Sequence, residues 1–233
     1  MQEKLQQNAC YSLEDPQVAA VLRRLHSAAA KDKWRVAKAL PRAIPGLLRG
    51  LSINEAVRPH FDGAMLAISP EQGRFLYLLA RATGACNVVE FGTSFGISTI
   101  YLAAAVRDNG GNGKVIGTEM REVKRERAVA NLKEAGLSAF AEVRLGDALK
   151  TLRVLDKPVD LVLLDGWKDL YIPVLELLRE RLRPGAVVVA DNIFTFKKAL
   201  APYVEMMGSG RAGFRSVTVP FAAGFAYSVK LDA

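Results

Sequence analysis

Cysteine, histidine and long apolar runs are scarce in this sequence, and each shortage excludes a class of protein. The 233 residues include two cysteines, Cys10 and Cys86, and two histidines, His26 and His60. Cysteines so few and far apart indicate neither a disulfide framework nor a thiolate metal site, and two histidines exclude a histidine-rich metal site. No apolar run reaches the roughly 18 residues of a membrane-spanning helix. The start of the chain lacks the apolar core of a signal peptide. We therefore expect no membrane span and a cytoplasmic protein.

Acidic residues are scarce in the first quarter of the chain. Between residues 21 and 60, nine Lys or Arg residues stand against two acids, Asp32 and Glu55, in a chain of net charge +8. This excess is compatible with an anionic partner such as a nucleic acid, an acidic membrane surface or an anionic substrate. A solvated helix face is the simpler interpretation of the same charges.

Residues 1–60 show no strand pattern and are predicted to be helical. Asp15 and Pro16 form an N-cap and first-turn pair that leads into apolar residues at helical spacing. A second amphipathic segment, residues 34–51, is interrupted by Pro41 and Pro45, so we expect it to be bent or split. We predict that residues 1–60 form a helical cap or lid on a domain formed by residues 61–233. A membrane-surface helix is the alternative for the second segment.

From residue 69 onward, helical and strand patterns alternate. Ser69 and Pro70 begin a helix that Gly84 ends. Strands are expected at 87–90, 114–118, 140–145, 159–164, 186–190, 215–219 and 225–231, and helices near 96–107, 122–135, 148–155, 167–182 and 194–206. This alternation predicts an α/β fold with a doubly wound, mostly parallel seven-stranded sheet, helices on both faces and an antiparallel C-terminal strand.

The first predicted strand runs into a glycine turn that opens a helix, which is the nucleotide-binding arrangement of doubly wound sheets. Gly92 and Gly96 let the backbone turn sharply and let a ligand approach closely. Glu90 would repel a pyrophosphate but would hold a cation, and S-adenosylmethionine (SAM) carries an ammonium and a sulfonium without phosphate. Glu119, at the end of the next strand, stands where such folds place a carboxylate on ribose hydroxyls. We therefore predict a SAM site, the alternative being that both glycines only form turns.

Two later apolar strands end in acidic residues. One strand runs into Asp165, and the other into Asp191 and Asn192. If the strands are neighbours, about 4.8 Å apart, these side chains enter one small volume at the carboxyl edge of the sheet. Two carboxylates and an amide oxygen suit Mg²⁺, with Mn²⁺ or Ca²⁺ as alternatives. The competing interpretation is that both aspartates only cap the helices that follow them.

Several motifs, taken in order, resemble one protein family. They are Ala67–Gly73, Val88–Ser98, Gly146–Ala148, Asp165–Tyr171 and Ala190–Asn192. Together they are similar to the class I SAM-dependent, metal-dependent O-methyltransferases that include the catechol and caffeoyl-CoA O-methyltransferases, over about residues 65–233. The resemblance implies methyl transfer to a hydroxyl of a small aromatic or vicinal-diol acceptor, and a homodimer.

The same resemblance implies a role for each matched residue. The cofactor-binding residues would be Ile68, Glu90, Gly92, Ser94, Gly96, Ser98, Glu119, Met120, Asp147, Ala148, Asp165 and Trp167. The metal ligands would be Asp165, Asp191 and Asn192, and Lys168 would be the general base. Without the motif, Lys168 would be interpreted as an ordinary exposed helix lysine.

Two departures from the family pattern concern the substrate. Gly166 stands where relatives often carry a larger residue, which is expected to leave the cofactor pocket less filled. Residues 217–224 contain no acid, whereas relatives of the catechol type use an acidic side chain there to orient the second hydroxyl. We therefore expect a more apolar or bulkier acceptor, with Phe221, Phe225 and residues 34–51 as its walls. The competing hypotheses are a hydroxylated tRNA base as acceptor, suggested by the basic N-terminal segment, and a SAM-binding protein without catalysis.

Overall fold

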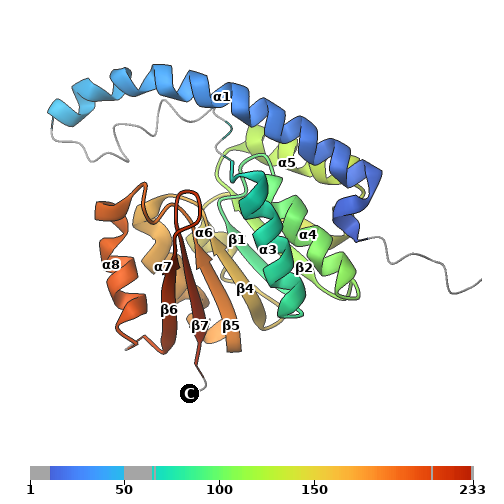
Figure 1. Ribbon diagram of the computed structural model, residues 1–233. Coiled ribbons are helices and arrows are strands. Elements are labelled where there is room, and N and C mark those ends of the chain that lie inside the picture. Colours follow the sequence, from blue (N-terminus) through green and yellow to red (C-terminus); the bar gives the residue numbers. More distant parts are fainter. Residues whose placement is uncertain (1–10, 50–64, 66, 211, 232–233) are drawn as a thin grey trace, which may run out of the picture.

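The structure is a computed structural model that describes residues 11–49, 65, 67–210 and 212–231. Figure 1 shows a sheet with helices on both sides and a long helix across one end. The helices are η1 (Ser12–Glu14), α1 (Pro16–Leu48), α3 (Pro70–Ala82), α4 (Ile97–Asp108), α5 (Glu122–Glu134), η2 (Ser138–Phe140), α6 (Ala148–Thr151), η3 (Lys168–Leu170), α7 (Tyr171–Leu178), η4 (Arg179–Arg181) and α8 (Lys197–Gly208). The strands are β1 (Asn87–Phe91), β2 (Lys114–Glu119), β3 (Ala141–Leu145), β4 (Val159–Leu164), β5 (Leu182–Ala190), β6 (Phe214–Val219) and β7 (Phe225–Lys230).

The seven strands form one sheet in the order β3-β2-β1-β4-β5-β7-β6. Strands β1 to β5 pair in parallel, and β7 pairs antiparallel with both β5 and β6. The predicted fold class is therefore confirmed, including the antiparallel strand at the C-terminus. The chain order reverses beside β1, where such sheets bind their ligands.

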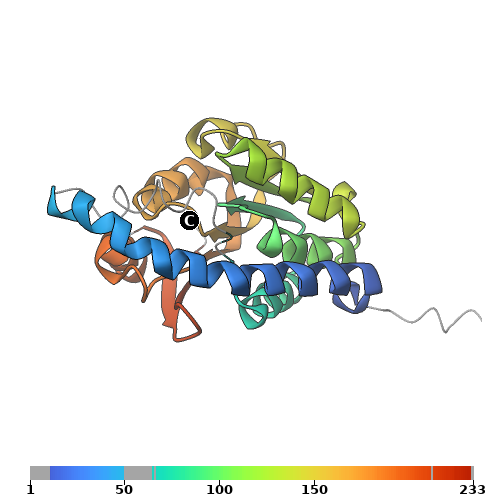
Figure 2. The same cartoon turned by 90° about the horizontal axis from the view of Figure 1, so that it is seen from above.

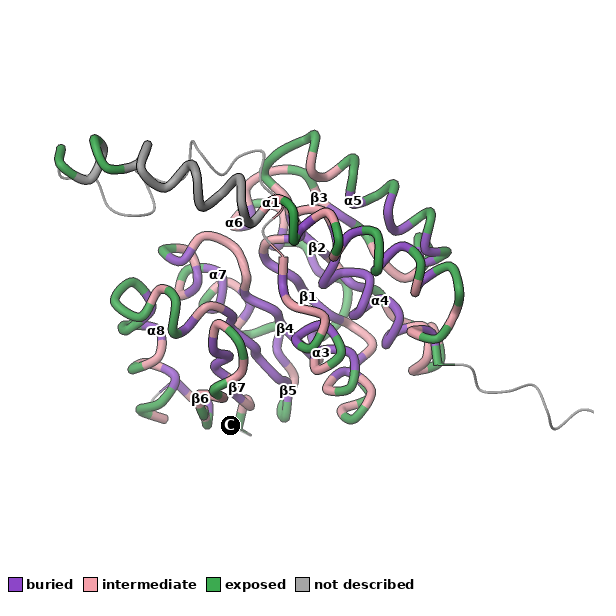
Figure 3. The backbone as a smooth tube through the Cα atoms, turned by 45° about the horizontal axis from the view of Figure 1, so that its top comes forward, coloured by how far each residue is buried: buried purple, intermediate pink, exposed green. Residues whose placement is uncertain are grey.

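Apolar residues alternate between the two faces of the sheet, so the molecule has two cores. Val88 and Leu163 pack under α1, α3, α4 and α5, whereas Val89 and Leu164 pack against α6, α7 and α8. The parallel strands can be apolar on both faces because helices cover both sides. In Figure 3, buried residues follow one another along the central strands and alternate with exposed residues along the helices.

Helix α1 runs without a break from Pro16 to Leu48. The expectation that the second segment is split is therefore wrong, whereas a bend of the helix stays a prediction. Pro41 and Pro45 each lack one backbone N–H, and the loss of two local hydrogen bonds does not end the 33-residue helix here. Its first half packs on α4 and α5 and buries Val18 and Leu25. Its second half extends over the end of the sheet toward α8 (Figures 1 and 2).

A polar cluster fastens the beginning of this helical segment to α4. The Ser12 backbone N–H and hydroxyl both donate to the Asp108 carboxylate, and the Tyr77 hydroxyl donates to the same group at 2.6 Å. Arg107 donates from Nε to Ser12 Oγ at 2.6 Å and from its NH2 group to Asp15 at 3.2 Å. The start of α1 is thereby held in place. The predicted domain boundary at residue 60 lies outside the described residues.

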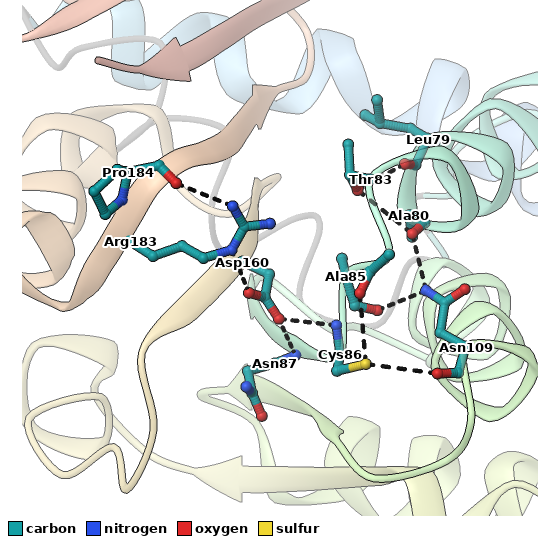
Figure 4. A network of polar contacts seen from close by, with 11 residues as sticks. Leu79, Ala80, Thr83, Ala85, Cys86, Asn87, Asn109, Asp160, Arg183 and Pro184 are labelled. Carbon is teal, nitrogen blue, oxygen red and sulfur yellow. Dashed lines mark hydrogen bonds and ion pairs between the residues drawn. The ribbon is translucent and has the colours of Figure 1, made fainter. Parts of the chain in front are cut away.

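At the amino end of the sheet, the carboxylate of Asp160 links three neighbouring strands through hydrogen bonds (Figure 4). Asp160 on β4 accepts hydrogen bonds from the backbone N–H groups of Cys86 and Asn87, at 2.9 and 2.7 Å, and from Arg183 Nε at 2.6 Å. Burial alone would raise the pKa of Asp160, but these donors outweigh it and hold the pKa below its ordinary value. Asp160 thus connects β1, β4 and β5 at the end opposite the glycine turn.

Three predicted boundaries need correction. Helix α6 ends at Thr151 instead of continuing to residue 155, and the helix predicted over 167–182 consists of α7 flanked by the short turns η3 and η4. Strand β5 begins at Leu182, so Pro184 and Gly185 lie inside it instead of before it. The β4–β5 register shifts between Val159 and Leu161, which accommodates this proline-containing start.

Candidate active site

The predicted cluster of oxygen donors forms at the carboxyl ends of β4 and β5. Leu164 and Ala190 are register partners in neighbouring strands, so Asp165 and Asp191 are the next residues on each. The Asp165 N–H donates to Phe91 O on β1 at 2.9 Å, and the Asp191 N–H donates to Leu164 O at 3.0 Å. The sheet itself therefore brings the two carboxylates side by side.

Hydrogen bonds fix the side chains of all three residues in this cluster, Asp165, Asp191 and Asn192. Asn192 Nδ2 donates to Asp165 Oδ1 at 3.0 Å, and the Asn192 N–H donates to Asp191 Oδ1 at 2.6 Å. Gln72 Nε2 on α3 donates to the same Asp191 oxygen at 3.0 Å. Asn192 has a φ of 70°, a left-handed conformation that asparagine tolerates better than most residues. Among the described residues, these hydrogen bonds do not use Oδ2 of either aspartate or Oδ1 of Asn192, so these three oxygen atoms could bind a cation.

Lys168 lies beside the carboxylates and is buried, with 9% of its surface exposed. Its Nζ is 3.6 Å from Asp165 Oδ1 and donates to Gly166 O at 3.0 Å and to Tyr171 Oη at 2.9 Å. Lys168 is therefore not the exposed helix lysine of the competing interpretation.

Burial changes the ionisation of this cluster. It lowers the pKa of Lys168, although the Asp165 and Asp191 carboxylates oppose that change. Burial raises the pKa of Asp165, partly offset by the Lys168 ammonium, and raises that of Asp191, with the Asp165 charge adding to the effect. Burial and mutual repulsion disfavour the negative charges of these two neighbouring carboxylates, and a bound cation would stabilise the charged forms.

The alternative role of the aspartates, helix capping, is not what the described helices show. The N-cap positions before η3, α7 and α8 are Trp167, Leu170 and Phe196, without a side-chain capping bond. Asp147, by contrast, does cap a helix, because its carboxylate accepts the Leu149 N–H at 2.9 Å.

The glycine turn after β1 surrounds a second carboxylate, Glu90. Its side chain is fully buried, and Oε2 accepts from the hydroxyls of Thr93, at 2.8 Å, and Thr99. Burial raises the pKa of Glu90, and the hydroxyls of Ser98, Thr99 and Thr93 partly offset the rise. The other carboxylate oxygen and the nearby Ser94 hydroxyl are buried without a hydrogen-bond partner among the described residues. A ligand that donates hydrogen bonds would satisfy both.

Both glycines of the turn are required by its geometry. Gly92 and Gly96 have φ values of 102° and 84°, which favour glycine. A Cβ on Gly92 would also lie 2.7 Å from the backbone of Asp165, so the turn packs directly against the donor cluster. Glu119, the predicted ribose ligand, accepts the Ser94 N–H at 2.9 Å and therefore sits at the same turn.

A pocket opens between this turn and the donor cluster. Its lining comprises Met65, Ala67, Ile68, Gly92, Thr93, Ser94, Phe95, Ile97, Ser98 and Asp165. The structure thus brings together five residues of the predicted cofactor set: Ile68, Gly92, Ser94, Ser98 and Asp165. Of the remaining predicted residues, Met120 is 48% exposed beyond β2, Ala148 is buried at the start of α6, and Trp167 is partly buried before η3.

Two expectations about the walls of the site change. The space beside Gly166 is filled by the Phe91 ring, which a Cβ on residue 166 would penetrate, so glycine here does not leave the pocket emptier. Phe225 is fully buried in the core and packs with Phe75 and Phe221, at ring-centroid distances of 5.7 and 6.2 Å. Phe225 therefore belongs to the core beneath the hairpin that joins β6 and β7 and is not a wall of the site, whereas Phe221, in the hairpin turn, is partly exposed. Of the predicted wall over residues 34–51, the side chains of residues 34–43, 46, 47, 50 and 51 lie outside the description.

Sequence reasoning assigned no role to two residues that hold the site. Gln72 completes a capping box with Ser69, whose N–H donates to Gln72 Oε1 at 2.9 Å, and also reaches Asp191. The S-x-x-Q spacing signals the capping box but not the contact 119 residues away. Tyr171 is fully buried and links Lys168 to the backbone of Asp191, and no local pattern indicates that link.

Comparisons with known proteins agree with this geometry. Residues 89–193 match a family model described as a methyltransferase domain. The chain is 38% identical over 150 residues to a catechol O-methyltransferase of Mycobacterium tuberculosis, covering 64% of this chain and 65% of that protein. It is 34% identical over 139 residues to one of Niastella koreensis, covering 58% and 62%. Less than two thirds of either curated relative is thus matched.

A solved structure gives broader coverage. The O-methyltransferase TomG of Streptomyces achromogenes, in complex with SAM, is 30% identical with a TM-score of 0.66, covering 75% of this chain and 86% of that one. The sheet order and the glycine turn define a class I methyltransferase fold. Within that class, the chain belongs to the SAM-dependent O-methyltransferases, and the curated relatives that it resembles include catechol O-methyltransferases.

Proposed function

We propose that this protein transfers the methyl group of SAM to a hydroxyl of a small aromatic or vicinal-diol acceptor. A divalent cation held by Asp165, Asp191 and Asn192 would orient and acidify the acceptor, and Lys168 would be the general base. The observation that carries the proposal is the buried Lys168 amine 3.6 Å from Asp165, next to three oxygen donors on neighbouring strands.

The residues of the glycine turn fit SAM. The unpartnered Glu90 oxygen and Ser94 hydroxyl are suited to a donor group such as the ammonium of the methionine part. A carboxylate at this position disfavours the pyrophosphate of a dinucleotide. Ile68 closes one side of the pocket, and Glu119 lies at the turn where a ribose carboxylate is expected. SAM would supply the electrophilic methyl group.

The donor cluster fits a hard divalent cation. Two carboxylates and one amide oxygen without a sulfur or imidazole ligand favour Mg²⁺, with Mn²⁺ or Ca²⁺ as alternatives. A cation there would compensate the two neighbouring carboxylate charges and supply the positive charge that lowers the pKa of an acceptor hydroxyl.

The chain's own residues then account for the proton and the alignment. The acceptor O–H bond breaks as its proton passes to the lone pair of the neutral Lys168 amine. The oxygen forms a bond to the methyl carbon while the S–CH₃ bond breaks, and its electron pair stays on sulfur. The products are the methyl ether, S-adenosylhomocysteine (SAH) and a proton that Lys168 returns to solvent. The turn and the strand ends serve to align oxygen, carbon and sulfur.

The role of α1 belongs to the same proposal. Because its second half extends over the carboxyl end of the sheet, we assign it as the cap on the acceptor side (Figure 2). Association as a homodimer stays a prediction.

The proposal is tested by turnover with SAM labelled in its methyl group, against a panel of catechols, other vicinal diols and single phenols. We expect labelled ether from aromatic diols with Mg²⁺, loss of turnover with a chelator, and recovery when Mg²⁺ is added back. Full turnover in excess chelator would contradict the role of the cation. SAH binding measured by calorimetry in the same chelator should persist, which separates loss of the cation from unfolding.

A further inference from the structure

Tyr171 occupies a connecting position between the amine of Lys168 and the donor cluster. Its side chain is fully buried, and its ring packs edge-on against Phe91 and Tyr203, at centroid distances of 6.4 and 5.7 Å. Its hydroxyl lies 2.9 Å from Lys168 Nζ and 3.1 Å from the backbone oxygen of Asp191. The two rings fix the phenol, so the position of its oxygen is set by the core.

The direction of these hydrogen bonds follows from the groups involved. A backbone carbonyl can only accept, so the Tyr171 hydroxyl proton is committed to Asp191 O. The Tyr171 oxygen can then only accept from Lys168. The Gly166 carbonyl, 3.0 Å from Nζ, is likewise an acceptor. Lys168 is therefore surrounded by two fixed acceptors, each of which takes one N–H.

These two acceptors determine where the lone pair of the Lys168 nitrogen points. A neutral amine has two hydrogens and one lone pair, and the two acceptors use both hydrogens. Asp165 Oδ1, at 3.6 Å, lies beyond the usual hydrogen-bond distance and does not compete closely for a hydrogen. We infer that Tyr171 is a positioning residue that locks the Lys168 side chain so that its lone pair is the one position left for the acceptor hydroxyl.

The inference rests on the proposed function, because it requires Lys168 to act as base. It adds that the base is tied to the metal-ligand strand, since the Tyr171 hydroxyl bonds to the backbone of Asp191 itself. The Tyr171 hydroxyl thus fixes the distance between the Lys168 amine and Asp191, because it bonds to both residues. Small displacements of a reacting group can cost on the order of a hundredfold in rate.

The test is Tyr171→Phe, which removes the hydroxyl and keeps the ring. Tyr203→Phe is the matched control, because Tyr203 is a neighbouring buried tyrosine whose hydroxyl has no hydrogen-bond partner among the described residues. We expect Tyr171→Phe to lower kcat by about tenfold to a hundredfold, with the KM for SAM and the SAH dissociation constant within about twofold of wild type. Tyr203→Phe should retain wild-type kcat.

Two further measurements distinguish positioning from general support of the fold. With a nitro-substituted aromatic diol, already ionised at the assay pH, no base is needed, so the kcat of Tyr171→Phe should return to near that of wild type. In the cofactor-free protein carrying ¹³C-labelled lysine, the two ε-protons of Lys168 should have separate NMR frequencies that merge in Tyr171→Phe. An equal loss of kcat with both kinds of acceptor, or unchanged ε-proton signals, would overturn the inference.

The outcomes also separate this inference from the proposed function. Wild-type kcat in Lys168→Ala would contradict the function itself. A large loss in Lys168→Ala combined with wild-type kcat in Tyr171→Phe would overturn only the positioning role of Tyr171.

Discussion

Replacing Lys168 by methionine tests the catalytic proposal most directly. Methionine keeps a long unbranched side chain but has no amine, so it removes the base with little change in packing. A general base contributes on the order of 10² to 10⁴ in rate, which is about 3 to 5 kcal/mol of activation free energy. The buried amine, with two fixed acceptors and a carboxylate at 3.6 Å, has the geometry of a fully engaged base. We therefore expect the substitution to lower kcat by a factor on the order of 10² to 10⁴.

The pH profile gives the same prediction a second readout. Burial lowers the pKa of Lys168 below its ordinary value of 10.5. The amine is the reactive form, so kcat should rise with pH as Lys168 loses its proton, with a midpoint below 10.5. Lys168→Met should lack this rising limb. The profile is measured at saturating SAM, diol and Mg²⁺.

The controls identify what has been lost. Lys198→Met removes an exposed lysine from α8 and should leave kcat and the pH profile unchanged. SAH affinity in Lys168→Met should stay within about twofold of wild type, because Lys168 is not among the residues lining the pocket at the glycine turn, where we propose that the cofactor binds. The reasoning is refuted if Lys168→Met retains more than about a tenth of wild-type kcat, or if kcat and SAH affinity fall together.

Three other substitutions test the surroundings of the site. Glu90→Gln should weaken SAH binding about tenfold by removing the charge opposite the ammonium. Burial raises the pKa of Glu90, so wild type loses stability as pH rises through that pKa, and the variant should melt no lower than wild type at pH 8. Unchanged SAH affinity would contradict this role. Asp160→Asn should lower the free energy of unfolding by about 1–3 kcal/mol in urea at pH 7. Because the folded pKa of Asp160 is depressed, that difference should shrink as pH falls through it, and a constant difference would count against the ionic contribution. Gly166→Ala should cost about 1–3 kcal/mol through contact with the Phe91 ring, and Phe91→Leu should relieve it; no loss in the single variant would disprove the contact.

The sheet and the donor cluster were predictable because local patterns determine them. Apolar strands that end in Asp165 and Asp191 place both residues at the carboxyl edge, and their adjacency follows once β4 and β5 pair through Leu164 and Ala190. Glycine at 92 and 96 likewise indicates a backbone with positive φ. Each of these signals is contained within a few residues of sequence.

The contacts that hold the cluster could not be predicted in the same way. Gln72 reaches Asp191 across 119 residues, and Tyr171 reaches it across 20, so neither contact leaves a local pattern. The space beside Gly166 is filled by the ring of Phe91, a residue of another strand, and the local sequence does not indicate this contact. Helix α1 shows the converse case, because the prolines are a strong local signal for a break that the helix as a whole does not follow.

The hairpin that joins β6 and β7, which the proposed function places beside the acceptor, is fixed to the donor cluster and carries no acid. The N–H groups of Ile193 and Phe194, directly after the donor cluster, donate to the carbonyls of Gly224 and Ala223 at 3.1 and 2.9 Å. The hairpin that joins β6 and β7 is thus fixed to the strand that carries Asp191, and the partly exposed Phe194 ring lies against Gly224. Because residues 217–224 contain no carboxylate, a second acceptor hydroxyl would meet no anionic partner on this hairpin. Acceptor choice there would depend on apolar contact with exposed rings, which favours acceptors with an apolar substituent over an unsubstituted catechol.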